Sequence, residues 1–189
     1  MRLPRLLVVT DRTQAAGPLA DVVADAVAAG ARAVVLRDRD LTEHERAALA
    51  ADLRALLDPV GGLLVTAGPA GGPAVHLAAA DPFPEPRPAL VGRSCHSAAE
   101  LAQARAEGCD WAFLSPVFPT ASKPGYGPAL GVEGFTRLQP LGPPAYALGG
   151  VGPGDAPALL AAGARGVAVM GPVMRDPSVV GAYQAALGG

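Results

Sequence analysis

The sequence is poor in aromatic and in charged residues. Phe, Trp and Tyr make up 4% of its 189 residues and the charged types 17%, whereas the hydrophobic types make up 50%. A chain this apolar can bury a full core, so the composition indicates a globular protein and argues against intrinsic disorder. No linker and no second domain can be recognised, and we expect residues 1–189 to form a single domain.

The sequence also lacks an excess of positive charge and a long apolar run. The formal net charge is −2 and the pI is about 5.9, so nucleic acid is not an expected partner. No apolar stretch approaches the ~20 residues of a membrane span. The apolar stretch near the start of the chain is too short for a signal peptide. We therefore expect a cytoplasmic protein with no membrane partner.

Cysteine and lysine are scarce. Cys95 and Cys109 are too few for a disulfide framework and lack zinc-ligand spacing, so we expect small buried fillers. Lys123 is the single lysine among fifteen lysines and arginines, and it lies in the loop-like stretch SPVFPTASKPGYG. Lysine carries a mobile point charge whereas arginine carries a rigid fork, and a leaving diphosphate would suit the former. An ordinary surface lysine is the alternative.

Short apolar runs alternate with helical segments along the chain. Eight such units predict a parallel sheet buried on both faces and an α/β fold of the compact (β/α)8 TIM barrel type. An open doubly wound sheet has the same local pattern and is the alternative. The stretches AGPAGGP and DPFPEPRP predict stunted helices after strands three and four. The expected strands are 6–10, 33–37, 63–66, 74–77, 89–94, 111–114, 145–148 and 166–170, and the expected helices are 19–29, 43–57, 98–107, 132–138, 155–162 and 178–187.

Polar residues gather directly behind the expected strands, where the active sites of such barrels lie. Arg37 and Arg39, in the stretch LRDRD, lie two residues apart at the end of the second strand. Two guanidinium groups on one side of a strand end can hold a phosphate or diphosphate. Asp38 and Asp40 could instead neutralise them in a surface network.

Glycines follow the seventh and eighth strands. Gly149 and Gly150 lie in ALGGVGPGD, and Met170 and Gly171 lie in VMGPV. Glycine lets backbone N–H groups approach an anion, and these two loops form the usual phosphate site of the barrel. A plain tight turn is the alternative.

Two histidines lie on or behind expected strands. His96 directly follows the fifth strand and could act as an acid, a base or a hydrogen-bond donor, or could simply precede a helix cap. His76 lies inside an apolar strand, which is more typical of a core histidine with its hydrogen bonds satisfied.

These motifs resemble the thiamine-phosphate synthase/TenI family over most of the chain. The resemblance rests on VVTDR, LRDRDL, VHL, SCH, LSPVFPTASKPGYGPALG, ALGGV and GVAVM. It implies a (β/α)8 barrel. Its synthases use Mg²⁺ to join a pyrimidine diphosphate to a thiazole phosphate and release diphosphate. By position, the resemblance implies a diphosphate site at Arg37, Arg39, Ser94, Thr120, Ser122 and Lys123, and a thiazole phosphate site at Gly149, Gly150, Met170 and Gly171.

The sequence departs from the synthase pattern. Residues 66–68 are Thr-Ala-Gly where synthases carry Asn-Asp-Arg with a Mg²⁺-binding aspartate, which leaves Asp81 as the candidate metal ligand. Val35 replaces the glutamine that would contact the pyrimidine, and Arg39 replaces a usual lysine. In thiazole tautomerases of the TenI type, a catalytic histidine occupies the position of Pro116.

The resemblance supports three readings of the function. The main one is a TenI-like enzyme of thiamine biosynthesis that binds a thiazole phosphate and has tautomerase-like proton-transfer activity, with Lys123, His96 and Ser94 as catalytic residues. The first alternative is a divergent, Mg²⁺-dependent thiamine-phosphate synthase. The second is a catalytically silent regulatory barrel that binds a phosphorylated ligand. A homodimer is expected, because barrels of this family often pair.

Overall fold

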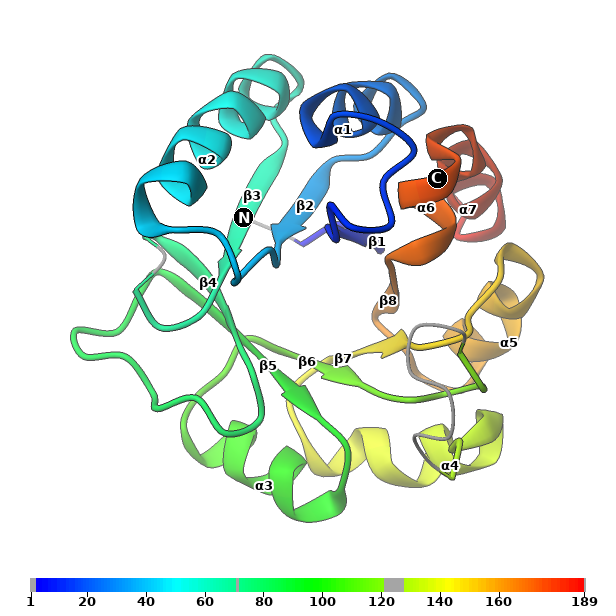
Figure 1. Cartoon of the computed structure of the whole chain (residues 1–189). Coiled ribbons are helices and arrows are strands. Elements are labelled where there is room, and N and C mark those ends of the chain that lie inside the picture. The colour runs from blue at the N-terminus through cyan, green and yellow to red at the C-terminus, as the bar shows by residue number, and fades with distance from the viewer. Residues whose placement is uncertain (1–2, 71, 121–127, 189) are drawn as a thin grey trace.

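The computed structural model describes residues 3–70, 72–120 and 128–188. Its eight parallel strands close into a barrel in chain order, and β1 pairs with both β2 and β8 (Figure 1). The predicted (β/α)8 TIM barrel is confirmed. The open doubly wound alternative is wrong, because the first and last strands pair with each other. The strands are β1 (Leu6–Val9), β2 (Ala33–Leu36), β3 (Leu63–Ala67), β4 (Ala74–Leu77), β5 (Leu90–Cys95), β6 (Trp111–Leu114), β7 (Ala145–Leu148) and β8 (Gly166–Val169).

Helices pack around most of the barrel (Figure 1). The α-helices are α1 (Leu19–Ala28), α2 (Glu43–Leu57), α3 (Ala98–Ala106), α4 (Gly131–Leu138), α5 (Ala156–Ala161), α6 (Gly171–Arg175) and α7 (Val180–Ala186). Short 3₁₀ helices span Asp58–Val60, Gln139–Leu141, Pro153–Asp155 and Pro177–Val179. Helix α6 was not predicted, because five residues are too few to show a helical period.

One side of the barrel lacks helices. In the described part of the chain, no helix connects β3 to β4 or β4 to β5. This confirms the prediction from the two proline- and glycine-rich stretches, because proline removes a backbone donor and glycine disfavours a helix interior. The connections still cover the strands, since every residue of β4 is buried.

Side-chain oxygens cap the N-termini of helices α2 and α3. Thr42 Oγ1 accepts a hydrogen bond from the Glu45 N–H, and the Glu45 carboxylate accepts one from the Thr42 N–H at 2.9 Å. These two hydrogen bonds form a capping box at the start of α2. Ser97 caps α3 through the Glu100 N–H, but the Glu100 carboxylate accepts from the His96 N–H instead of completing a box.

The barrel has two apolar layers, because side chains alternate along each strand. Leu7 and Val9 of β1 lie inside the barrel in one cluster with Trp111. Leu6 and Val8 lie in the other cluster, between barrel and helices. Gly92 makes room for the largest interior side chain, since a Cβ there would lie 2.0 Å from Cε2 of Trp111.

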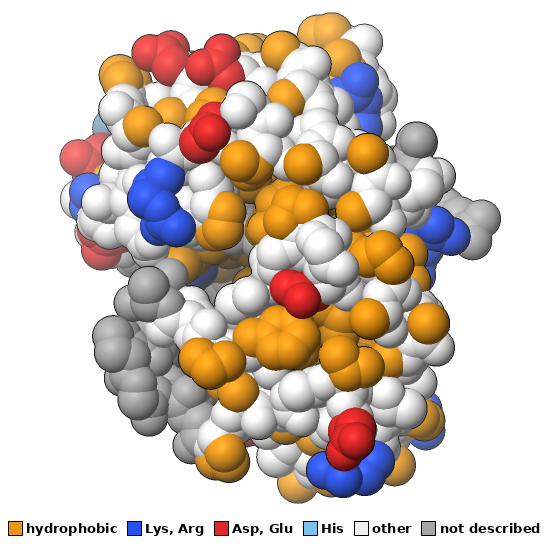
Figure 2. Space-filling view, turned by 90° about the vertical axis from the view of Figure 1, so that its right-hand side faces the viewer, with side chains coloured by type: hydrophobic (Ala, Val, Ile, Leu, Met, Phe, Trp, Pro, Cys, Tyr) orange, Lys and Arg blue, Asp and Glu red, His pale blue; other side chains and the backbone are white. Residues whose placement is uncertain are grey.

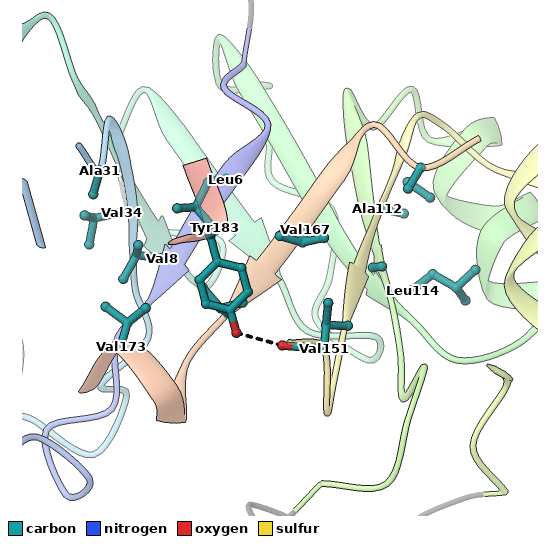
Figure 3. Close-up of a cluster of buried hydrophobic side chains, with 14 of the residues drawn as sticks. Leu6, Val8, Ala31, Val34, Ala112, Leu114, Val151, Val167, Val173 and Tyr183 are labelled. Atoms are coloured by element: carbon teal, nitrogen blue, oxygen red, sulfur yellow. Dashed lines mark hydrogen bonds between the residues drawn. The ribbon is translucent and has the colours of Figure 1, made fainter. Parts of the chain in front are cut away.

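The outer layer ties α7 to the loop behind β7. Tyr183 of α7 lies among Val8, Val167 and Val173, and its hydroxyl donates a hydrogen bond of 2.8 Å to the Val151 carbonyl (Figure 3). This contact fixes one wall of the cavity described below, because both residues of the hydrogen bond also line it.

The described chain contains no helix that is long and apolar enough to cross a membrane. On the helical face shown in Figure 2, acidic and basic side chains are scattered among hydrophobic and uncharged ones. The described residues of this face therefore form no continuous basic patch of the kind that nucleic-acid binding needs.

Candidate functional site

A cavity of about 680 Å³ opens at the carboxyl ends of the strands. Its lining includes residues that follow β2, β5, β6, β7 and β8, which lie far apart in the sequence. The predicted site residues that line it are Arg37, Arg39, Ser94, His96, Thr120, Gly149, Gly150, Met170 and Gly171. Ser122 and Lys123 lie outside the described residues. The structure therefore brings every described phosphate-site candidate to one cavity.

The two arginines behind β2 form one side of this cavity. Arg37 Nη1 lies 3.6 Å from the Asp11 carboxylate, and Arg39 forms a two-pronged pair with Asp81. The predicted alternative named Asp38 and Asp40 as their neutralising partners, and this is wrong. Asp38 accepts from the Thr10 hydroxyl and the Arg12 N–H, and Asp40 pairs with Arg12.

Asp81, the candidate metal ligand, is bound by nitrogen donors. Its Oδ1 and Oδ2 each lie 3.1 Å from an Arg39 Nη atom, and Oδ2 also accepts from the Ala78 N–H at 2.8 Å. Burial alone would raise the pKa of Asp81, but the Ala78 hydrogen bond and the Arg39 charge hold it below its ordinary value.

The described residues do not fit a protein-built Mg²⁺ site. Mg²⁺ requires several oxygen ligands in near-octahedral geometry. Among residues 3–70, 72–120 and 128–188, no three His, Cys, Asp or Glu side chains lie together where they could hold a metal. The one carboxylate at the expected place, Asp81, is already paired with Arg39.

The glycines behind β7 are required by the backbone. Gly149 and Gly150 have φ angles of +94° and +65°, which favour glycine. A Cβ at Gly150 would lie 2.4 Å from the Pro119 carbonyl oxygen, so the loop behind β7 lies directly against the segment behind β6. The tight-turn reading is therefore supported, and the same glycines also line the cavity.

Gly171 begins α6 beside an arginine that the sequence analysis did not single out. A Cβ at Gly171 would lie 2.8 Å from Nη1 of Arg175, which also lines the cavity. Arg175 was missed because it lies five residues beyond the eighth strand in a stretch with no predicted helix. It adds a positive charge to the glycine side of the cavity.

His76 and Ser94 lie together on the cavity floor. His76 Nε2 is 3.0 Å from Ser94 Oγ, and the imidazole stacks on Phe113 with a centroid distance of 3.9 Å. Nδ1 has no hydrogen-bond partner among the described residues. Burial, and then the nearby charge of Arg93, lower the pKa of His76 to about 3. His76 is thus a neutral core residue, as its apolar strand predicted, but the expectation that its hydrogen bonds are satisfied is wrong, because only Nε2 has a partner among the described residues.

Ser115 orients the ring of His96. The Nδ1 atom of His96 lies 2.8 Å from the Ser115 carbonyl oxygen and 3.2 Å from the Ser115 hydroxyl oxygen. The Ser115 carbonyl can only accept a hydrogen bond, so the contact with it is made by the tautomer that carries a proton on Nδ1. His96 lines the cavity, as a residue with acid–base or donor function would.

A buried arginine binds the turn between β4 and β5 that carries Asp81. Arg93 of β5 is fully buried, and its Nη1 lies 2.9–3.1 Å from the carbonyl oxygens of Ala78, Ala79 and Asp81. Its Nη2 lies 2.8 Å from the Glu107 carboxylate. Arg93 therefore holds the turn that carries Asp81. It was missed because its strand was interpreted as apolar throughout.

We expect both cysteines to be unreactive in the native protein. Both are buried, and burial raises the pKa of Cys109 and raises that of Cys95 to about 12. At pH 8, roughly one Cys95 thiol in ten thousand is then ionised, and the thiolate is the reactive form. A disulfide exchange reagent should label neither thiol in buffer and both in 8 M urea, with the Cys95→Ala and Cys109→Ala variants to assign the signals. Rapid labelling in buffer would contradict the predicted role as buried fillers.

Comparison with known proteins gives consistent relatives. The family model described as thiamine monophosphate synthase matches residues 6–173. A Geobacter sulfurreducens protein provisionally named thiamine-phosphate synthase is 37% identical to this chain. The match covers 91% of this chain and 87% of the relative. The thiamine-phosphate synthase of Methanoculleus marisnigri is 35% identical, over 94% of this chain and 90% of the relative. The structure of thiamine phosphate pyrophosphorylase from Pyrococcus furiosus superposes with a TM-score of 0.81, at 24% identity over 97% and 95% of the two chains.

Proposed function

Because the chain belongs to the thiamine monophosphate synthase family, we propose that it joins a pyrimidine diphosphate to a thiazole phosphate and releases diphosphate. The names of the relatives favour this reading, the first alternative of the sequence analysis, over the TenI-like reading. Nothing in the comparisons supports tautomerase activity. The homodimer and the cytoplasmic location stay predictions.

One observation carries the proposal: guanidinium groups, glycine-rich loops and apolar side chains line a single cavity. Arg37 and Arg39 lie behind β2, and the glycines and Arg175 lie behind β7 and β8. Val9, Val35, Phe113 and Ala168 line the cavity with apolar atoms. Two phosphorylated heterocycles suit this arrangement, because the rings favour apolar surface and the phosphates favour guanidinium and backbone N–H donors.

The place of each residue in the cavity suggests its role in the proposed reaction. Arg37 and Arg39 hold the diphosphate and stabilise the negative charge that it gains on leaving. Ser94 reaches the same side with His76 as its hydrogen-bond partner. The backbone of Gly149, Gly150 and Gly171 receives the thiazole phosphate. Ser122 and Lys123 remain candidates for the diphosphate side on sequence grounds.

The test is thiamine phosphate formation by the purified protein, supplied with the pyrimidine diphosphate, the thiazole phosphate and Mg²⁺. Replacing Arg37 by Gln should lower kcat/KM about 100-fold, because a charge-assisted contact to the leaving group is lost. Lys123→Ala should cause a loss of similar size.

Arg54→Gln serves as the control, because Arg54 approaches Gly72 ahead of β4, away from the cavity. It should leave turnover unchanged. Absence of product in the wild type, with thiazole phosphate still bound in calorimetry, would overturn the synthase proposal in favour of the TenI-like reading or the silent binding barrel.

A further inference from the structure

The carboxylate at the expected metal position already has a cation. Asp81 is 14% exposed at its side chain, and both of its oxygens face the two Nη atoms of Arg39 at 3.1 Å. A two-pronged guanidinium–carboxylate pair fixes the plane of both groups. A divalent cation that bound Asp81 directly would lie next to this guanidinium and be repelled by its positive charge.

The end of β3, beside this pair, is occupied in the same way. A Cβ at Gly68 would lie 3.9 Å from Nη2 of Arg39, so the guanidinium lies against the strand end where the resemblance would place an acidic metal ligand. The Ala67 carbonyl, an oxygen that a metal could use, accepts a hydrogen bond from Arg46. Guanidinium groups thus contact a carbonyl oxygen at the end of β3 and the carboxylate behind β4.

Arg93 makes this arrangement rigid. Its Nη1 binds three carbonyls of the turn, including that of Asp81 itself, and the Glu107 carboxylate holds its other end. The Asp81 carboxylate is therefore aimed at Arg39 by a fully buried support. The side chain of Arg39 is in turn 46% exposed and lines the cavity.

We infer that Arg39, held by Asp81, is the resident cation of this site, and that the protein binds a diphosphate group through guanidinium donors with no obligatory divalent cation. That the anion is a diphosphate rests on the proposed function. Arg39 has five N–H donors and directs one from each Nη to Asp81, which leaves the others for an anion. Arg37 lines the same side of the cavity and supplies a second guanidinium.

The first test is calorimetric titration of the whole protein with inorganic pyrophosphate, once in EDTA and once in Mg²⁺. We expect binding in EDTA with a Kd no more than about threefold weaker than in Mg²⁺, because the guanidinium N–H groups bind the anion directly. Binding that is detectable only in Mg²⁺ would overturn the inference.

Two substitutions separate the guanidinium from the carboxylate. Arg39→Met should weaken pyrophosphate binding in EDTA at least tenfold, whereas the control Arg54→Met should leave it unchanged. Asp81→Asn should retain binding in EDTA or tighten it about threefold, because a negative charge near the anion is removed. A metal-ligand role predicts the opposite for Asp81→Asn, a loss of Mg²⁺-dependent binding, and that result would refute the inference even if Arg39→Met failed to fold.

The outcomes separate this inference from the proposed function. Binding of pyrophosphate in EDTA without formation of thiamine phosphate would support the guanidinium site and reject the synthase activity. Formation of thiamine phosphate together with strictly Mg²⁺-dependent pyrophosphate binding would support the synthase activity and reject the metal-independent guanidinium site.

Discussion

Acidification from pH 6.5 to pH 4 is expected to lower the free energy of unfolding by roughly 3 kcal/mol through His76 alone. Burial lowers the pKa of His76 to about 3 in the folded protein, against 6.5 for a histidine in the unfolded chain. Between these values the unfolded chain binds a proton that the native state excludes. The stability contribution is therefore complete above pH 6.5 and is lost as the pH falls toward 3.

The surroundings of His76 explain the direction of the shift. Burial against Phe113 and Trp111 removes the water that an imidazolium needs, and the positive charge of Arg93 opposes a second one. The negative charge of Asp81 acts in the other direction but is the weaker effect. Desolvation of a buried histidine thus prevails over its one acidic neighbour.

Urea unfolding at a series of pH values measures this effect. His76→Phe keeps a ring between the same aromatic side chains and should remove most of the pH dependence between 6.5 and 4. His44→Gln, at an exposed position of α2, should leave it intact. Equal slopes for the wild type and His76→Phe would show that the acid sensitivity originates elsewhere.

Replacing Arg93 by Leu is expected to destabilise the protein by about 3–5 kcal/mol. The substitution leaves the Glu107 carboxylate without its buried partner and removes the donor shared by three carbonyls. A buried pair that loses one member leaves an uncompensated charge, and this cost exceeds that of an exposed pair. Chemical denaturation at pH 7 measures the change.

The exposed pair of Arg87 and Asp110 provides a matched control. Its nitrogen–oxygen distance is 2.9 Å, close to the 2.8 Å of the buried pair, but both of its side chains are at least 32% exposed. Arg87→Leu should therefore change the free energy of unfolding by only about 1 kcal/mol or less. Glu107→Gln should recover part of the loss in the Arg93→Leu background. Equal effects of the two arginine substitutions would refute the assigned role of Arg93.

Local patterns in the sequence were sufficient to predict the eight strands and six of the seven α-helices of the described residues. Most of the strands are short apolar runs, and the caps at Thr42 and Ser97 mark where α2 and α3 begin. The closure of the barrel could not be predicted in the same way. It depends on the pairing of β1 with β8, and residues some 160 positions apart leave no mark in a local period.

The site residues that directly follow strands could be predicted, but their partners from distant parts of the chain could not. Arg37, Arg39 and the glycines were found because they directly follow strands, which is where barrel sites form. Their partners could not be predicted, since Asp81 is 42 positions from Arg39 and belongs to another unit of the barrel. Arg93 lies in an apolar strand and gave no sequence signal of its role.

The helix-free side of the barrel has a consequence for the unfolded state. The segment between β4 and β5 carries Pro82, Pro84, Pro86 and Pro88, and Phe83 from it packs on the cluster that contains Val75 and Leu77. Proline restricts the backbone before folding begins, by an amount worth about 0.4–1 kcal/mol per compatible residue. An irregular segment can therefore cover β4 in place of a helix, because much of its conformational entropy is already absent from the unfolded chain.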